Sequence, residues 1–271
     1  MAVDLARDLV PDELWTLAAP LIPPFRPRQQ GGGTAPVADR RVFTAVVYVL
    51  TSGCAWRYLP PTFGTSPATA HRRFTAWTKA GLWRRLHRAV LDELGARGEL
   101  DWTSAIVDAA SVRAKRGSLT GPNPVDRGKK GSKVHVLSEA QGLPLAVGVS
   151  GANLHDSQAL KPLVLGIPAV RSWRGPRRRR PVKIRADKAY YSAEHLRWLR
   201  GRNLIPRIAR PGIESGERLG RHRWKIERTI AWLFGYRRLT VRYERNGSHF
   251  LAFLGLAATL TCYKKLAKLT T

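Results

Sequence analysis

Apolar residues recur every three or four positions through the first hundred residues, which is the spacing of helices that bury one face. Leu14, Leu17 and Leu21 follow this spacing, and Ser66 followed by Pro67 is a typical helix start, a hydroxyl cap with proline in the first turn. The pattern predicts helices over residues 5–23, 39–52, 66–79 and 82–94. We therefore expect the first part of the chain to be helical.

From residue 104 onward, short apolar runs alternate with helical segments. The predicted strands are residues 104–112, 133–138, 143–149, 182–187 and 204–208, and the predicted helices are 156–165, 193–200 and 221–234. This order is that of a ribonuclease H-like α/β fold, a mixed sheet with flanking helices in which the first three strands are antiparallel and the first and fourth are neighbours. We divide the chain into a small helical, helix-turn-helix-like region, residues 1–98, and a ribonuclease H-like domain, residues 99–271. The apolar C-terminal helix, residues 249–266, is too interrupted by Thr and Lys to predict a membrane span.

Basic residues greatly outnumber acidic ones: 47 Lys and Arg stand against 19 Asp and Glu, a formal net charge of +28. Such an excess predicts a polyanionic partner, and nucleic acid before a membrane, because no basic amphipathic helix of the membrane type stands out. The two cysteines have no partner at metal-ligand spacing, which argues against a zinc site or a disulfide framework. Residues 101–271 hold only 11 of the acids, so acids on apolar elements there become informative.

One carboxylate lies at the centre of the first predicted strand and another ends the fourth. Asp108 and Asp187 are far apart in the chain, yet the predicted fold makes their strands neighbours. A lone buried Asp is as readily explained by a turn cap or an ion pair, but two acids delivered on strands to one place are typical of a cation site. The third acid should come from the last predicted helix, residues 221–234, where Glu227 is the only carboxylate. Divalent ions held this way can assist the attacking and leaving oxygens of a phosphoryl displacement.

Several segments together resemble bacterial insertion-sequence transposases of the DDE type, in the group of insertion sequences four and five. They are residues 52–60 (SGCAWRYLP), 71–77 (HRRFTAW), 106–108 (IVD), 131–135 (GSKVH), 153–156 (NLHD), 186–190 (ADKAY) and 223–233 (RWKIERTIAWL). The resemblance implies that Asp108, Asp187 and Glu227 are the catalytic triad and bind Mg²⁺, with Mn²⁺ as the alternative. A fourth acid, Asp156, lies in one of these segments, and for it we favour the role of a helix N-cap.

The chain departs from the helix signature of that family at two positions. Gly220 stands where the signature has Tyr, and Phe234 stands where it has Lys, so that Arg237 or Arg238 would have to supply the cation. Arg223 does match the signature, and the resemblance gives it a phosphate-contacting role. An intrahelical ion pair with Glu227 is the alternative.

Basic side chains in three places are candidates for contact with DNA. The helix that starts at Ser66 would be the second helix of a helix-turn-helix, and an ordinary helical subdomain with solvated arginines is the alternative. A basic loop, residues 113–131, and the residues after the last predicted helix supply further cations. The DNA-binding candidates are Arg223, Lys129, Lys130, Lys133, Arg72, Arg73, Arg237 and Arg238.

The resemblance predicts a transposase that binds the terminal inverted repeats of its element and catalyses metal-dependent strand cleavage and strand transfer. The expected partners are double-stranded DNA at the element ends and at the target, and a homodimer or higher oligomer in the complex with DNA, with no membrane. The expected location is the bacterial cytoplasm, associated with the nucleoid. A structure-directed nuclease on the same fold and a DNA-binding regulator without catalysis are the alternatives.

Overall fold

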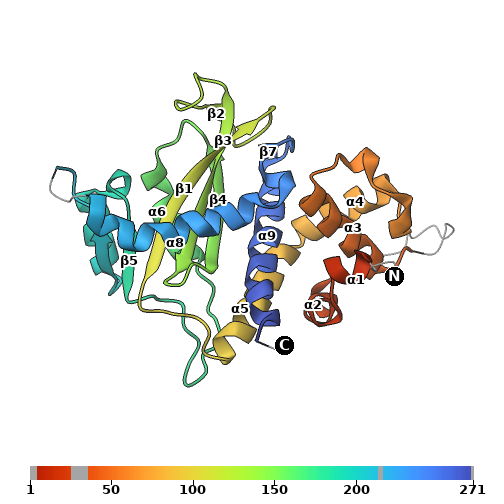
Figure 1. Ribbon diagram of the computed structural model, residues 1–271, viewed down its shortest axis with the longest axis horizontal. Helices are drawn as coiled ribbons and strands as arrows, with labels where there is room; N and C mark the ends of the chain where they lie inside the picture. The colour runs from red at the N-terminus through yellow and green to blue at the C-terminus, as the bar shows by residue number, and fades with distance from the viewer. Residues whose placement is uncertain (1–4, 26–35, 213–215, 270–271) are drawn as a thin grey trace.

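The computed structural model describes residues 5–25, 36–212 and 216–269, and for residues 216–222 it describes only the helical backbone. The first part is helical, as the apolar spacing predicts (Figure 1). Its elements are α1 (Leu5–Leu9), α2 (Asp12–Ala18), η1 (Ala19–Leu21), α3 (Asp39–Ser52), η2 (Trp56–Tyr58), η3 (Pro61–Phe63), α4 (Pro67–Lys79) and α5 (Leu82–Ala96), where η denotes a 3-10 helix.

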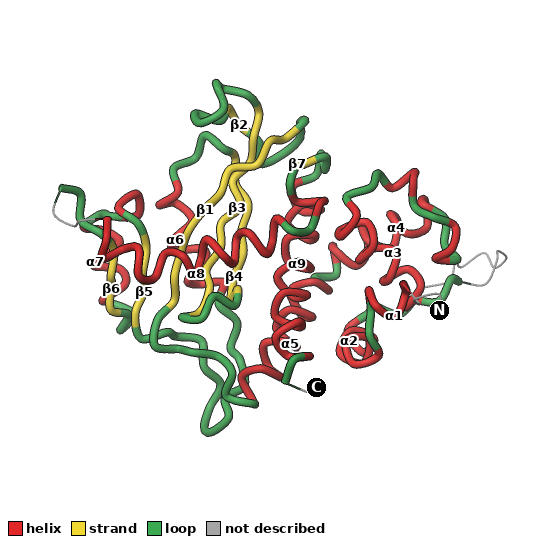
Figure 2. The backbone as a smooth tube through the Cα atoms, in the orientation of Figure 1, coloured by secondary structure: helices red, strands yellow, loops and turns green. Residues whose placement is uncertain are grey.

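The second part alternates strands with helices (Figure 2). Its strands are β1 (Ala105–Ala114), β2 (Gly121–Pro122), β3 (Lys130–Glu139), β4 (Pro144–Gly151), β5 (Lys183–Ala186), β6 (Ile205–Ile208) and β7 (Val241–Arg242). Its helices are η4 (Asp156–Ala159), α6 (Leu160–Gly166), η5 (Lys188–Tyr190), α7 (Ala193–Arg200), α8 (Gly216–Phe234), η6 (Arg237–Leu239) and α9 (Gly247–Ala267).

The strands form one mixed sheet. β1 pairs antiparallel with β3, β3 pairs antiparallel with β4, and β5 pairs parallel with both β1 and β6. β2 continues the sheet beside β3, and β7 pairs with the end of β1. The first three long strands are therefore antiparallel and the first and fourth lie side by side. This confirms the predicted ribonuclease H-like α/β fold.

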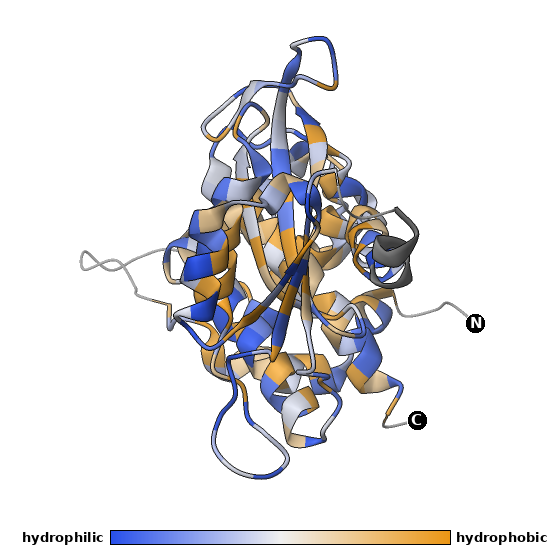
Figure 3. Ribbon diagram, turned by 90° about the vertical axis from the view of Figure 1, so that its left-hand side faces the viewer, coloured by the Kyte–Doolittle hydropathy of each residue, from blue (hydrophilic) through white to orange (hydrophobic). Residues whose placement is uncertain are grey.

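Helices cover the two faces of the sheet and separate it from the N-terminal region. α8 crosses the sheet over β1 and β3, while α6 packs on β3 and β4 (Figure 1). Apolar residues concentrate along the central strands and the helix faces that meet them, whereas the long loops are mainly hydrophilic (Figure 3). The alternation of side chains along β1 and β3 therefore delivers successive residues to opposite helical layers.

α9 lies between the sheet and the N-terminal helices, packed against α5 and β4 (Figure 1). By length and composition alone it could span a membrane, contrary to our expectation, but 72% of its most apolar window is buried inside the protein. Phe253 of α9 stacks on Phe74 of α4 with ring centroids 4.5 Å apart, and Trp56 packs against both rings. α9 thus serves as a core helix that joins the two parts.

The helix ends follow the predicted local chemistry, but the connector between α3 and α4 does not fit a helix-turn-helix. The Ser66 hydroxyl accepts a hydrogen bond from Thr69 N at 3.2 Å, and Gly53 ends α3 in the left-handed conformation at φ +73°. Residues 53–66 include η2 and η3, so the connector is far longer than the turn of about 3–4 residues in that motif. The helical region therefore has a different arrangement from the one we predicted.

Candidate catalytic centre

The parallel register of β1 and β5 brings the two strand carboxylates together. The last paired residues are Val107 and Ala186, and the next position on each chain is an acid, Asp108 and Asp187. Neighbouring strands lie about 4.8 Å apart, so the two acids leave adjacent backbones at the same level. The Asp108 carboxylate accepts a hydrogen bond from Ala109 N at 2.8 Å, and the Asp187 carboxylate accepts one from Lys188 N at 2.5 Å.

α8 supplies the third acid and a cation to the same place. Ile226 and Leu233 face the core, which leaves Glu227 and Arg223 on the exposed side one helical turn apart. Arg223 Nε lies 2.9 Å from Glu227 Oε1, and Arg223 Nη1 lies 3.8 Å from Asp187 Oδ2. The guanidinium therefore links the acid of the helix to the acid after β5.

Asp187, Glu227 and Arg223 all affect the pKa of the Asp108 carboxyl. Burial raises the pKa of the Asp108 carboxyl, and the nearby Asp187 and Glu227 carboxylates raise it further. The Ala109 N–H and the Arg223 guanidinium act in the opposite direction, although burial prevails. A carboxylate that shares a site with two others gains most from a bound cation.

The donor set suits Mg²⁺ or Mn²⁺, which prefer carboxylate oxygens and keep open positions for phosphate and water. Among the side chains that the structure describes, no three His, Cys, Asp or Glu residues lie close enough to hold one ion together. Instead, Arg223 contacts both Asp187 and Glu227. Gathering the carboxylates around an ion therefore requires the guanidinium to release them, and a phosphate group would be a suitable new partner for it.

Three of the predicted DNA-binding side chains are engaged inside the protein, and those predictions are wrong. Arg73 is buried, pairs with Asp39 and lies over the Trp77 ring. Arg238 is buried against Glu244, with Nε 2.6 Å from Oε1. These arginines stabilise the packing of distant segments, so neither can face a phosphate.

Lys133 on β3 is the third residue that was predicted to bind DNA and is engaged within the protein. Its Nζ donates to Leu154 O at 2.7 Å and lies 2.8 Å from Asp156 Oδ1, and only 14% of the side chain is exposed. Asp156, the partner of Lys133, was expected to be a helix N-cap. The N-cap residue of η4 is instead His155, and Asp156 is the first residue of that helix. The pair instead fixes the loop after β4 against β3. The other candidates, Arg72, Lys129, Lys130, Arg237 and Arg223, are exposed.

Two buried polar residues beside this pair were not predicted as site residues. The Nε2 atom of His135 lies 2.7 Å from Ser150 Oγ, and burial lowers the pKa of this histidine to about 4. The Tyr190 ring is buried, and the electrostatic influence of Asp156, Asp108 and Asp187 reaches its hydroxyl. The only sequence signal for either was its place within a segment that carries the family resemblance, residues 131–135 and 186–190.

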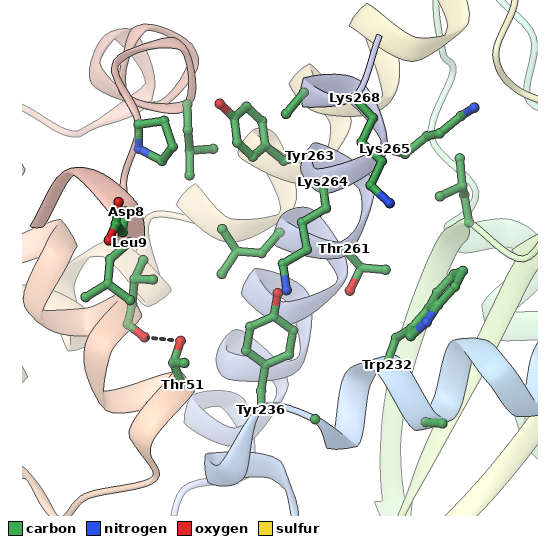
Figure 4. A pocket seen from close by; sticks show the side chains of 18 of the residues that line it. Asp8, Leu9, Thr51, Trp232, Tyr236, Thr261, Tyr263, Lys264, Lys265 and Lys268 are labelled. Atoms are coloured by element: carbon green, nitrogen blue, oxygen red, sulfur yellow. Dashed lines mark hydrogen bonds between the residues drawn. The ribbon is translucent and has the colours of Figure 1, made fainter. Parts of the chain in front are cut away.

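A groove lies away from these carboxylates, between the N-terminal helices, the end of α8 and α9 (Figure 4). It has a volume of about 1160 Å³. Lys264 and Lys265 of α9, the C-cap residue Lys268 and Tyr236 line it (Figure 4). Asp108, Asp187 and Glu227 are not among its lining residues, so the groove and the carboxylate centre are separate features.

Comparison with known families defines the class of protein. A family model described as "Transposase DDE domain" matches residues 103–262, and one described as "Putative transposase of IS4/5 family" matches residues 10–87. The chain belongs to the DDE transposases.

Two relatives come from Burkholderia cepacia. The chain is 45% identical over 149 residues to a protein described as "Putative transposase for insertion sequence element IS402", covering 55% of this chain and 71% of that protein. It is 42% identical over 112 residues to an uncharacterised 16.2 kDa protein of the same insertion element, covering 41% of this chain and 76% of that protein. A Mos1 pre-cleavage transpososome structure matches over 88% of this chain and 82% of that one, at 10% identity and a TM-score of 0.29, which is too low to support an argument.

Proposed function

We propose that this transposase binds the terminal inverted repeats of its own element and uses Asp108, Asp187 and Glu227 for metal-dependent cleavage and strand transfer. The observation that supports this most strongly is the register of β1 and β5, which places Asp108 beside Asp187 under the helix that carries Glu227. Asp108, Asp187 and Glu227 come near one another around Arg223 on a chain of net charge +28, and a purely structural role would not require this.

The three carboxylates would hold Mg²⁺, or Mn²⁺ in its place. Divalent ions bound there would supply an activated oxygen nucleophile and stabilise the leaving oxygen. Asp108, which is the most buried of the three, provides the rigid side of the site because its strand is paired on both edges. Arg223 is free to exchange its contacts with Asp187 and Glu227 for the phosphate beside the scissile bond, using its planar fork.

The exposed cations would hold the DNA on either side of this centre. Arg72 lies on the outer face of α4, and Lys129 and Lys130 lie where the basic loop enters β3. Residues 1–98 would recognise the element ends, while residues 99–271 would carry out the reaction. We expect two or more copies to act together in the bacterial cytoplasm, since the two ends of an element must be brought to one target.

The proposal is tested by cleavage of labelled duplexes that carry the DNA flanking the gene. The full chain should cut at the repeat ends in Mg²⁺ and lose activity in excess chelator. Asp108→Asn, Asp187→Asn and Glu227→Gln should each retain end binding and lose cleavage by orders of magnitude. Asp12→Asn is the matched control, because it removes the same charge from an exposed pair with Arg40.

Two results would count against the proposal. Sustained cleavage in chelator would rule out the metal-dependent reaction, and equal binding to repeat ends and random duplex would rule out end recognition. Cleavage of any branched or nicked duplex, without preference for the repeats, would favour the nuclease alternative.

A further inference from the structure

We propose that Tyr190 is a positioning residue of the catalytic centre, whose hydroxyl donates a hydrogen bond to the Asp108 and Asp187 carboxylate pair when metal ions bind. This inference rests on the proposed function and extends it to a residue outside the triad. It assigns different roles to the two parts of the side chain: the ring anchors a turn, and the hydroxyl orients a carboxylate.

The backbone links Tyr190 directly to one of the acids. Asp187 is the N-cap of η5 and Tyr190 is the last residue of that one-turn helix, with Tyr190 N donating to Asp187 O at 3.0 Å. On its other side, Tyr190 O lies 2.9 Å from His195 Nδ1 of α7. The buried ring therefore fixes the turn that presents Asp187.

The hydroxyl is the unexplained part of the residue. Tyr190 is 1% exposed, and its oxygen is buried without a hydrogen-bond partner among the described residues. A buried hydroxyl that donates to nothing costs about 1–3 kcal/mol, so a purely structural site would be better served by phenylalanine. An orphaned donor beside a reaction centre indicates that its partner arrives with a change in the centre.

Three acids act electrostatically on the hydroxyl. Asp156, Asp108 and Asp187 add to the effect of burial and raise the pKa of Tyr190 well above its ordinary value. The hydroxyl therefore keeps its proton and is available only as a donor toward carboxylates. Of the three acids, Asp156 has its charge offset by Lys133 at 2.8 Å, although its Oδ1 makes no hydrogen bond among the described residues. Within the described part of the chain, Asp108 and Asp187 have no cation as close, which favours them as the acceptors of the hydroxyl.

The arrival of metal ions supplies the missing geometry. If Arg223 released Asp187 and the two carboxylates held an ion, each carboxylate would retain an oxygen that can accept a hydrogen bond. Hydrogen bonds from such outer groups orient metal-binding carboxylates, and their loss typically costs about 10–100-fold in metal affinity or activity.

The test compares Tyr190→Phe with Tyr236→Phe in the full chain assembled on a terminal-repeat duplex. Tyr236 is also buried, but it stands in the groove beside Lys264 rather than among the acids. Mn²⁺ affinity is measured from the loss of the free-ion electron paramagnetic resonance signal, alongside cleavage rate and melting temperature. We expect Tyr190→Phe to weaken Mn²⁺ binding and cleavage by about 10–100-fold with an unchanged or higher melting temperature, and Tyr236→Phe to leave Mn²⁺ binding unchanged.

Asp108→Asn separates this inference from the function on which it rests. If Asp108→Asn weakens Mn²⁺ binding while Tyr190→Phe matches the unmodified protein in both affinity and cleavage, the role of the Tyr190 hydroxyl is refuted and the proposed function stands. If Asp108→Asn binds Mn²⁺ as well as the unmodified protein does, both proposals fail. A drop in the melting temperature of Tyr190→Phe with unchanged Mn²⁺ affinity would also refute the positioning role.

Discussion

Two carboxylates on neighbouring strands, the buried Glu139 and the half-buried Asp108, have different surroundings. Glu139, at the end of β3, is completely buried and accepts hydrogen bonds from three backbone N–H groups, those of Asp101 at 3.1 Å, Gln141 at 2.9 Å and Leu143 at 2.8 Å. Among the residues that the structure describes, Asp108, in the middle of β1, accepts one hydrogen bond, from the N–H of Ala109, and two acids and one arginine act on it electrostatically. Burial raises the pKa of both carboxyl groups.

The difference suggests how a structural acid can be told from one that is available to a ligand. The oxygens of Glu139 accept from Gln141 and Leu143 in the turn between β3 and β4 and from Asp101 before β1, so this acid holds these segments together. Among the described residues, Asp108 has fewer donors, which is consistent with the metal-binding role that we propose. A raised pKa alone would not have distinguished the two carboxyl groups, whereas the count of hydrogen-bond donors does.

The largest expected effect comes from neutralising each of these acids in turn. Asp108→Asn should abolish cleavage, a loss of several orders of magnitude, with little change in the free energy of unfolding. Glu139→Gln should lower the free energy of unfolding by about 1–3 kcal/mol, because its amide group cannot accept from all three N–H donors. Cleavage per folded molecule should persist in that variant. Cleavage assays and urea denaturation of both proteins measure the two effects, and a reversed pattern would contradict the comparison.

A second test compares two adjacent arginines of α4, one with partners inside the protein and one exposed to solvent. Arg73 is satisfied by Asp39 and Trp77, whereas Arg72 is exposed. Arg73→Ala should lower the free energy of unfolding by about 1–3 kcal/mol. Arg72→Ala should leave the stability near that of the unmodified protein and reduce the dependence of log affinity on log salt by about 0.9, the value for one lost phosphate contact. Filter binding over a salt series decides between these outcomes, and an unchanged slope for Arg72→Ala would remove it from the DNA surface.

The smallest expected effect concerns His87, a buried histidine whose ring is hydrogen-bonded within the protein. Burial lowers the pKa of His87 to about 4, although its hydrogen bond to Pro144 O acts in the opposite direction. The unfolded chain has a pKa near 6.5 at this position, so it binds a proton that the folded protein excludes. Stability should therefore be constant above about pH 6.5 and fall by up to about 1.4 kcal/mol per pH unit between pH 6.5 and pH 4.

Comparing the unmodified protein with His87→Gln in urea at pH 7 and pH 5.5 isolates this contribution, since other titrating groups are common to both. The variant should lose less stability on acidification. Equal losses in the two proteins would show that His87 carries no such penalty.

The sequence was sufficient for the features that depend on local pattern and chain order. The strand order followed from the apolar runs, and the helix start at Ser66 and the helix end at Gly53 followed from cap chemistry. Asp108 and Asp187 could be placed together because a fold with adjacent first and fourth strands leaves few alternatives.

Whether an individual Lys or Arg side chain points inward or toward solvent could not be predicted in the same way. Arg73 turns inward because Asp39, thirty-four residues earlier, comes to lie beside it after the helices pack. Arg238 is buried because Glu244, six residues later, and the carbonyl of the distant Cys54 both contact its guanidinium. Lys133 could not be assigned because its partner lies on a loop whose path depends on β4. Each of these contacts is a product of tertiary packing, which residue spacing does not encode.

The most direct test of the carboxylate centre changes the chemistry of one ligand rather than removing it. Asp108→Cys replaces an oxygen that suits Mg²⁺ with a thiolate that suits softer ions such as Cd²⁺. If Asp108 binds the metal, cleavage by this variant should be absent in Mg²⁺ alone and should recover by at least about tenfold when Cd²⁺ is added, while the unmodified protein shows no such gain. Two results would contradict the account of Asp108 as a metal ligand. One is that Asp108→Cys stays inactive when Cd²⁺ is added, and the other is that it cleaves in Mg²⁺ alone as well as the unmodified protein does.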